Sequence, residues 1–245
     1  MFRHYGSKRS YKQNLRLATM LSFVAGIVNI TGILSIRILT TNVTGHFAYF
    51  SEEFFKKNYA IALVYLAFTL FFLLGAFTSN VLTEIVIQKS PRKSHLLPII
   101  LEIVLLLSVA FFGNTNTIDL LETKFSAFAL LFAMGIQNSM VTKISKSTVR
   151  TTHLTGLFTD LGIELSQLIF NKKPVERLVL KSTIYLRLSI IFFFFMGCFV
   201  GGLCYNILKF KTLIIATLVL LLALFYDYSK LKIIKLKRSL TQNKL

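Results

Sequence analysis

Residues 40–54 read TTNVTGHFAYFSEEF, and residues 151–165 read TTHLTGLFTDLGIEL. The two stretches share the pattern Thr-Thr-x-x-Thr-Gly-x-Phe, and this polar pattern stands out from the apolar sequence around it. Upstream, Gly26-Ile-Val-Asn29 matches Gly135-Ile-Gln-Asn138. Downstream, the stretch ending Gly75-Ala-Phe77 resembles Gly197-Cys-Phe199 more loosely. Self-similarity of this kind predicts that the chain contains two copies of one structural unit.

The composition places both copies in a membrane. Hydrophobic residues make up 54% of the 245 residues, while 28 Lys and Arg face only 10 Asp and Glu, a net charge of +18. A soluble domain of this size cannot cover so much apolar side chain, because its surface must remain largely polar. The composition therefore excludes a soluble enzyme, a disordered chain and a disulfide scaffold. It also argues against a nucleic-acid partner, in spite of the charge.

Six apolar stretches are long enough to cross a bilayer core of about 30 Å as helices. They are residues 17–39, 59–82, 96–113, 125–142, 184–208 and 212–228. We therefore expect an all-α polytopic membrane protein with one transmembrane domain over 17–228. Its first repeat covers 17–113 and its second 125–228, between a basic N-terminus, 1–16, and a basic tail, 229–245.

The basic residues alternate between loops. Of the Lys and Arg residues, 21 fall in residues 1–16, 88–95, 143–181 and the tail, whereas the three intervening loops hold 5. Basic loops remain in the cytoplasm, so both termini are predicted to be cytoplasmic. We expect the basic segments to contact anionic lipid headgroups.

Each copy contains three spans. Because three is an odd number, the second copy must cross the membrane in the opposite sense to the first. Inverted repeats of this kind are typical of secondary transporters, whose substrate site lies between the two halves.

Polar residues interrupt the apolar sequence at the same place in each copy. Glycine permits a helix break, and Asn or Thr can satisfy the freed backbone groups. The candidate substrate-binding or ion-binding residues are Asn29, Thr44, Gly45, Gln137, Asn138, Thr155 and Gly156. Alternatively, the amide side chains only bridge neighbouring helices. We also expect Thr44 and Thr155 to cap helices over 45–57 and 156–170.

Two further candidates are acidic. Asp160 and Glu164 share one face of the predicted helix 156–170, where either could couple transport to a cation. The alternative is an amphipathic helix at the membrane surface, with its polar face in water. For Glu53, in the corresponding helix of the first copy, this interfacial interpretation is preferred.

No motif indicates catalysis. The sequence contains no phosphate-binding loop, no His-Glu-x-x-His, no Gly-x-Ser-x-Gly and no Cys/His cluster. We therefore expect no enzymatic activity, no cofactor and no metal. Cys198 and Cys204 are interpreted as small buried apolar residues.

The combined motifs resemble the YoaK family, bacterial inner-membrane proteins of unknown function with about six predicted helices. The most specific stretch is Arg150-Thr-Thr-His-Leu-Thr-Gly-Leu-Phe-Thr-Asp160, and the resemblance extends over about residues 17–228. It departs from the family where this chain has Asn29 in place of Asp and His46 in place of Asn. The resemblance implies a multi-pass protein of the bacterial inner membrane, with no established substrate.

The leading hypothesis is a secondary carrier or permease for a small solute or ion. Asn29, Gln137 and Asn138 would contact the substrate, and a homodimer is plausible because six spans are few for a carrier. A non-transporting membrane scaffold is the main alternative. A lipid-modifying enzyme that uses His153, Asp160 and Glu164 is a weaker one.

Overall fold

The computed structural model describes residues 9–90, 93–113, 120–171 and 173–242, and this part of the chain is predominantly α-helical. The elements are α1 (Tyr11–Ile36), α2 (Val43–Phe55), α3 (Tyr59–Lys89), α4 (Leu96–Phe112), α5 (Leu120–Ser145), α6 (Leu154–Phe170), α7 (Pro174–Leu208), η3 (Lys209–Thr212) and α8 (Leu213–Gln242). The predicted all-α class is confirmed.

Four stretches are long and apolar enough to cross a membrane, by length and composition. They are Tyr11–Ile36, Tyr59–Gln88, Lys124–Ser145 and Pro174–Asp227. The last stretch spans 54 residues and joins α7, η3 and α8. Helix α4 has 17 residues, a rise of about 26 Å, which is shorter than a typical hydrocarbon core. The helices are those of a membrane protein, and six separate spans remain a prediction.

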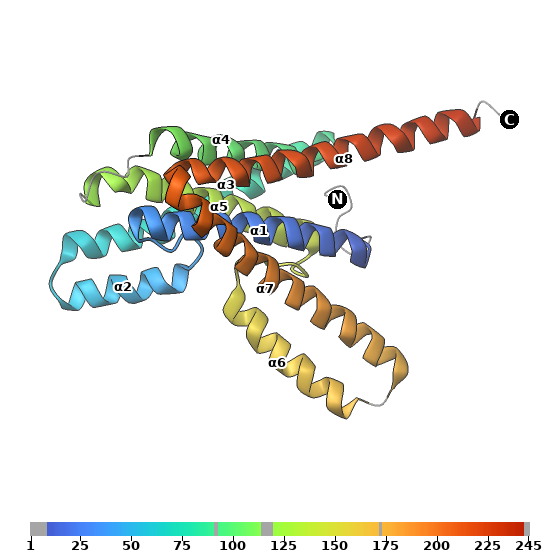
Figure 1. Ribbon diagram of the computed structural model, residues 1–245, viewed down its shortest axis with the longest axis horizontal. Coiled ribbons are helices and arrows are strands. Elements are labelled where there is room, and N and C mark those ends of the chain that lie inside the picture. Colours follow the sequence, from blue (N-terminus) through green and yellow to red (C-terminus); the bar gives the residue numbers. More distant parts are fainter. Residues whose placement is uncertain (1–8, 91–92, 114–119, 172, 243–245) are drawn as a thin grey trace.

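Six helices form the bundle, and α2 and α6 leave it at opposite ends. The bundle contains α1, α3, α4, α5, α8 and the C-terminal half of α7 (Figure 1). Helix α2 packs against the start of α3 at one end. Helix α6 pairs with the first half of α7, and this hairpin projects away from the bundle toward the other end.

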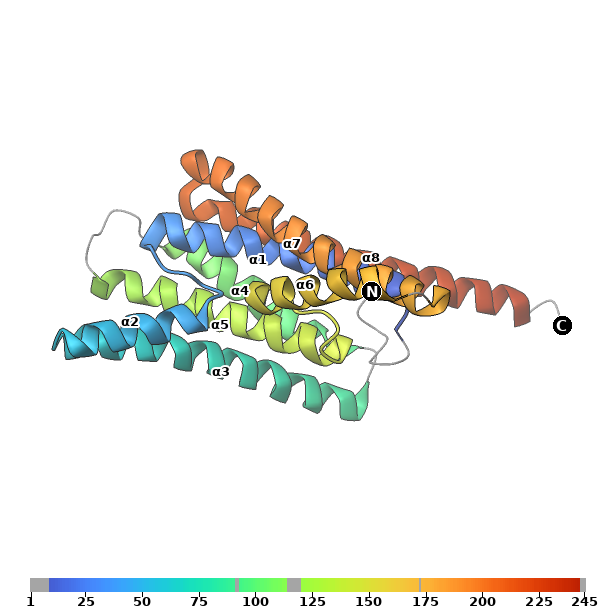
Figure 2. The ribbon, with the colours of Figure 1, turned by 90° about the horizontal axis from the view of Figure 1, so that it is seen from below.

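Helices at equivalent places in the two copies run in opposite directions. Helix α1 runs antiparallel to α5, α3 to α7, and α4 to α8 (Figures 1 and 2). The contacts are crosswise, because α1 packs mainly on α7 and α5 mainly on α3. The first copy therefore packs α1 against α7 of the second copy, and the second copy packs α5 against α3 of the first.

Glycines allow the two main helix crossings to be close. Gly26 and Gly197 face each other's helix where α1 crosses α7, and Gly75 and Gly135 do so where α3 crosses α5. A Cβ atom on any of the four would overlap a backbone carbonyl oxygen of the opposite helix. Small residues let helices approach in this way in membrane proteins. The glycine matches noted in the sequence thus mark equivalent crossings.

The bundle buries its interior and exposes apolar side chains outward. Fully buried residues in the core cluster include Leu21, Val28, Leu106, Met134, Ile190 and Leu220. Exposed apolar residues on the outer faces include Leu63, Leu73, Phe77, Phe195, Leu222 and Phe225. So large an exposed apolar surface is unfavourable in water, and it fits contact with lipid.

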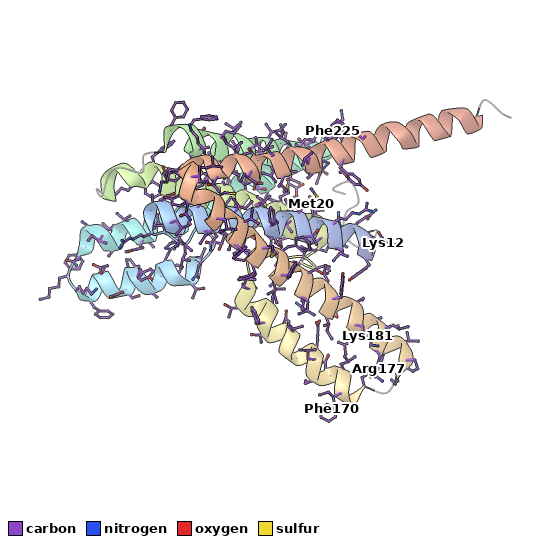
Figure 3. All side chains as sticks on the ribbon, in the orientation of Figure 1. Lys12, Met20, Phe170, Arg177, Lys181 and Phe225 are labelled. Carbon is purple, nitrogen blue, oxygen red and sulfur yellow. The ribbon has the colours of Figure 1, made fainter. Side chains whose placement is uncertain are left out.

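The basic residues gather at one end of the molecule. Lys12, Arg177 and Lys181 lie toward the end where α1 begins and α8 finishes (Figure 3). The opposite end holds the turn η3, with Lys209 and Lys211. Some residues of the predicted basic segments lie outside the described residues, namely Arg3, Lys8, Arg92, Lys172 and Lys244.

Two helix ends differ from the ends of the expected spans for identifiable reasons. The span expected from residue 184 belongs to a helix that begins at Pro174, because proline suits the first helical position and its missing N–H needs no partner there. The span expected to reach residue 39 ends at Ile36, because Arg37 adopts a left-handed conformation that closes the helix. Apolar composition alone indicated neither feature.

Candidate functional site

In each copy the chain turns back into the bundle before the short helix begins. Residues 37–42 follow α1, and residues 146–153 follow α5. Helices α2 and α6 consequently start near the middle of the molecule and run outward to opposite ends (Figures 1 and 2). The two Thr-Thr-x-x-Thr-Gly motifs lie at these starts, so motifs far apart in the sequence meet in the interior.

A cavity of about 810 Å³ lies between the two helix starts. Both copies line it through residues at matching positions. The pairs are Asn29 and Asn138, Thr41 and Thr152, Asn42 and His153, Thr44 and Thr155, and Phe72 and Phe194. Gly45 also lines the cavity, whereas Gly156 lines a smaller neighbouring pocket. Five of the predicted site residues therefore meet in one place, although they come from distant parts of the sequence.

An asparagine holds each returning segment to its long helix. The hydroxyl of Thr41 donates to Asn29 Oδ1 at 3.1 Å, and that of Thr152 donates to Asn138 Oδ1 at 2.7 Å. Each bond joins two side chains and links the returning segment to the helix that precedes it. The asparagines thus stabilise the two reversals as well as lining the cavity.

The predicted helix caps are wrong by two residues. The N-cap residues are Asn42 and His153, so Thr44 and Thr155 are the second residues of α2 and α6. Asn42 Oδ1 accepts a hydrogen bond from the Gly45 N–H at 3.0 Å. Since each helix begins earlier than expected, its threonine lines the cavity instead of capping the helix.

Gln137 bridges helices and does not line the cavity. Its side chain is fully buried, and Nε2 donates to the backbone carbonyl of Leu21 on α1 at 3.0 Å. It also donates to the Thr151 hydroxyl at 3.4 Å. This geometry matches the bridging alternative weighed for Gln137, a tie between α5 and α1.

Asp160 and Glu164 face an arginine on the next helix. Arg187 Nη1 lies 2.8 Å from Asp160 Oδ2, and Nε lies 2.9 Å from Glu164 Oε2. Asp160 also borders a pocket of about 210 Å³, which shares Arg150 and His153 with the central cavity. Asp160 therefore borders the pocket that adjoins the cavity, and Arg187 neutralises one of the two negative charges that Asp160 and Glu164 carry.

The acids and His153 do not form one active site. His153 precedes α6, and Glu164 lies eleven residues later along the sequence, a helical rise of about 16 Å. Glu164 is bound to Arg187 and borders neither the cavity nor the smaller pocket. A lipid-modifying site that uses His153, Asp160 and Glu164 together has no support in this geometry.

Glu53 lies near the outer end of α2 and matches the interfacial interpretation. It accepts a hydrogen bond from Asn58 at 2.8 Å and pairs with Lys56 at 3.1 Å. These hydrogen bonds lower the pKa of the Glu53 carboxyl below its ordinary value. Its partners are all local, and it does not line the central cavity.

Sequence reasoning missed the place of Arg150 in the cavity lining and the structural role of His46. Arg150 lines the cavity, although it was counted only among the basic loop residues. Its position directly before the second Thr-Thr pair, where the first copy has Leu39, was an available signal. His46 is 2% exposed, donates from Nε2 to the Leu39 carbonyl at 2.8 Å and packs against Phe68. His46 therefore links residues 37–42, where the chain turns back, to α2 and α3.

Long apolar helices around a cavity lined by Asn, Thr and Arg side chains are the features of a helical membrane protein. The chain belongs to the family described as protein of unknown function (DUF1275), which matches residues 17–226. No curated protein and no solved structure matches the chain. The likeness to the YoaK family remains a prediction.

Proposed function

We propose that this protein is a secondary carrier or permease of the bacterial inner membrane and that the central cavity is its substrate site. One observation carries the proposal. The cavity is lined by equivalent residues of two sequence copies, with the start of a short helix from each. Broken helices that begin at the middle of a bundle commonly form substrate sites in carriers.

The opposed helix directions support an inverted repeat. Each copy supplies three bundle helices and one helix outside the bundle, and each bundle helix runs antiparallel to its counterpart. The halves contact each other through matching glycine crossings. Two similar halves around one site can rock relative to each other and expose it to alternate sides of the membrane.

The positive-inside rule supports a cytoplasmic location for the basic end. The hairpin of α6 and α7 leaves the bundle on this side, and the pocket beside Asp160 adjoins the cavity there. On the other side, α2 packs on α3, and His46 lies buried against Phe68. We therefore assign this conformation as open toward the cytoplasm.

A non-transporting scaffold is the second candidate, and particular contacts favour it. Asn29 and Asn138 hold the reversals, and Gln137 ties α5 to α1. Polar groups with these roles are needed in any such bundle, whether or not it transports. A scaffold keeps one conformation, whereas a carrier must open its cavity to both sides.

Cysteines in the cavity distinguish the two functions without knowledge of the substrate. In a background lacking Cys198 and Cys204, Thr44→Cys and Thr155→Cys are introduced separately. Both threonines line the cavity, and neither side-chain hydroxyl makes a hydrogen bond among the described residues. An impermeant thiol reagent is applied to intact cells and to inverted vesicles. We expect each cysteine to react from both sides, because alternating access exposes the site to both.

Thr217→Cys provides the control. Thr217 is 2% exposed on α8 and lies away from the cavity, so we expect no labelling from either side. Reaction of both cavity cysteines from one side alone would contradict a carrier and favour the scaffold.

A further inference from the structure

The charged groups of the cavity have one sign. Among its lining residues, Arg150 and His153 are the ionisable side chains, and none is Asp or Glu. Within the described residues, no carboxylate makes an ion pair with the Arg150 guanidinium. The nearby acids Asp160 and Glu164 are paired with Arg187. Among the described residues, Arg150 therefore has no carboxylate in ion-pair contact, and the nearest acids are already engaged by Arg187.

The amide groups of the cavity leave donors without partners. Asn29 is buried, with an exposed fraction of 7%, and Oδ1 accepts from Thr41. Its Nδ2 has no hydrogen-bond partner among the described residues, although the side chain lines the cavity. Asn138 repeats the arrangement, and its Nδ2 is buried without a partner in the same part of the chain. A buried donor without a partner is unfavourable, and a hydrogen bond to a ligand oxygen would remove that penalty.

The starts of α2 and α6 add two positive helix ends. Val43 and Thr44 of α2, and Leu154 and Thr155 of α6, line the same cavity. The first backbone N–H groups of a helix have no partner within the helix, and the helix dipole favours an anion there. Asn42 caps Gly45 on α2, whereas His153 makes no cap hydrogen bond on α6. Donors from both halves thus face one volume.

We propose that the cavity binds a small soluble oxyanion, a carboxylate or phosphate group of a solute, with Arg150 as its charged partner. This inference rests on the proposed function and names its substrate class. Asn29 and Asn138 donate to the anion from opposite halves. The arginine occurs in the second half alone, because the matching position is Leu39. The two halves would then contribute unequally to binding, in spite of their similar backbones.

Intrinsic fluorescence tests the inference cleanly because the chain contains no tryptophan. Phe72→Trp places a reporter in the cavity lining, and Phe194→Trp provides a second reporter from the other half. The full-length protein is placed in phosphatidylcholine nanodiscs and titrated with inorganic phosphate, acetate and succinate as anions. Glucose and choline are the neutral and cationic probes, and a second nanodisc contains phosphatidylglycerol. We expect a saturable signal with at least one anion and none with glucose or choline.

Arg150→Gln is then compared with Arg177→Gln, which removes the same charge from an exposed residue outside the cavity. We expect Arg150→Gln to weaken anion binding about tenfold or more, since a charge-assisted hydrogen bond is lost, and Arg177→Gln to change it less than about twofold. Arg150→Lys should retain part of the affinity. Three results would overturn the proposal. They are the absence of a fluorescence change with every anion, an unchanged anion affinity in Arg150→Gln, and a fluorescence change that occurs only in nanodiscs with phosphatidylglycerol. If the cavity cysteines still react from both sides, such a result contradicts the anion as substrate class, while the proposed carrier function remains supported.

Discussion

Replacement of Gly135 by alanine is expected to destabilise the folded protein by about 3 kcal/mol or more, the upper range for overpacking a core. The added Cβ would overlap the backbone carbonyl oxygen of Phe72 on α3. Backbone cannot move aside as the end of a side chain can, so the two helices must separate. The measurement is thermal unfolding of the detergent-solubilised protein, followed by circular dichroism. The same result is expected for Gly26→Ala at the other crossing.

Gly162→Ala is the matched control for this change. Gly162 lies within α6, and a Cβ there meets nothing within 4 Å. We expect an unchanged or slightly higher melting temperature, because alanine is about 1 kcal/mol more favourable than glycine inside a helix. Equal melting temperatures for Gly135→Ala and the wild type would show that α3 and α5 do not pack as described.

Arg187→Gln is expected to release α6 from α7. Arg187 contacts Asp160 and Glu164 on α6 at 2.8 and 2.9 Å. Removal of its charge leaves two acids on one helix face without a partner and with mutual repulsion. Asp160 is half exposed, so water screens part of the loss, and we expect a local cost of about 1–3 kcal/mol. This corresponds to about tenfold or faster hydrogen exchange of the α6 amides, measured by mass spectrometry.

A compensating variant and a control make this expectation specific. Adding Glu164→Gln to Arg187→Gln removes the like-charge repulsion, so we expect part of the protection to return. Glu176→Gln breaks the exposed pair with Lys173, and we expect hydrogen exchange of α6 to stay as in the wild type, because water screens an exposed ion pair. Equal protection of α6 in Arg187→Gln and the wild type would mean that the arginine does not hold the helix.

The helices themselves could be predicted well from the sequence. Apolar runs longer than a bilayer requires indicate helices directly, and α3 begins at the expected residue 59. The polar repeat indicated the two helix breaks, because a match between polar residues is not explained by the general similarity of apolar segments. The start of α7 was missed because basic residues such as Arg177 and Lys181 lie on a helix that continues beyond its apolar part.

The partners within the site could not be predicted in the same way. Arg187 lies 23 and 27 residues from the two acids it contacts, and no periodic pattern links them. Gln137 and Asn138 are adjacent in sequence but point differently, because successive helical residues are about 100° apart. One bridges to Leu21 and the other lines the cavity. Such distinctions depend on which helices pack together, a property of the whole fold.

The central claim is that two inverted halves enclose the cavity, and the most direct test is the sidedness of two residues. Single cysteines replace Ser51 on α2 and Thr159 on α6, both exposed, in a background without Cys198 and Cys204. An impermeant thiol reagent is applied to intact cells and to inverted vesicles. We predict that Ser51→Cys reacts from outside the cell and Thr159→Cys from the cytoplasmic side. Labelling of both from the same side would contradict the inverted arrangement and, with it, the proposed carrier.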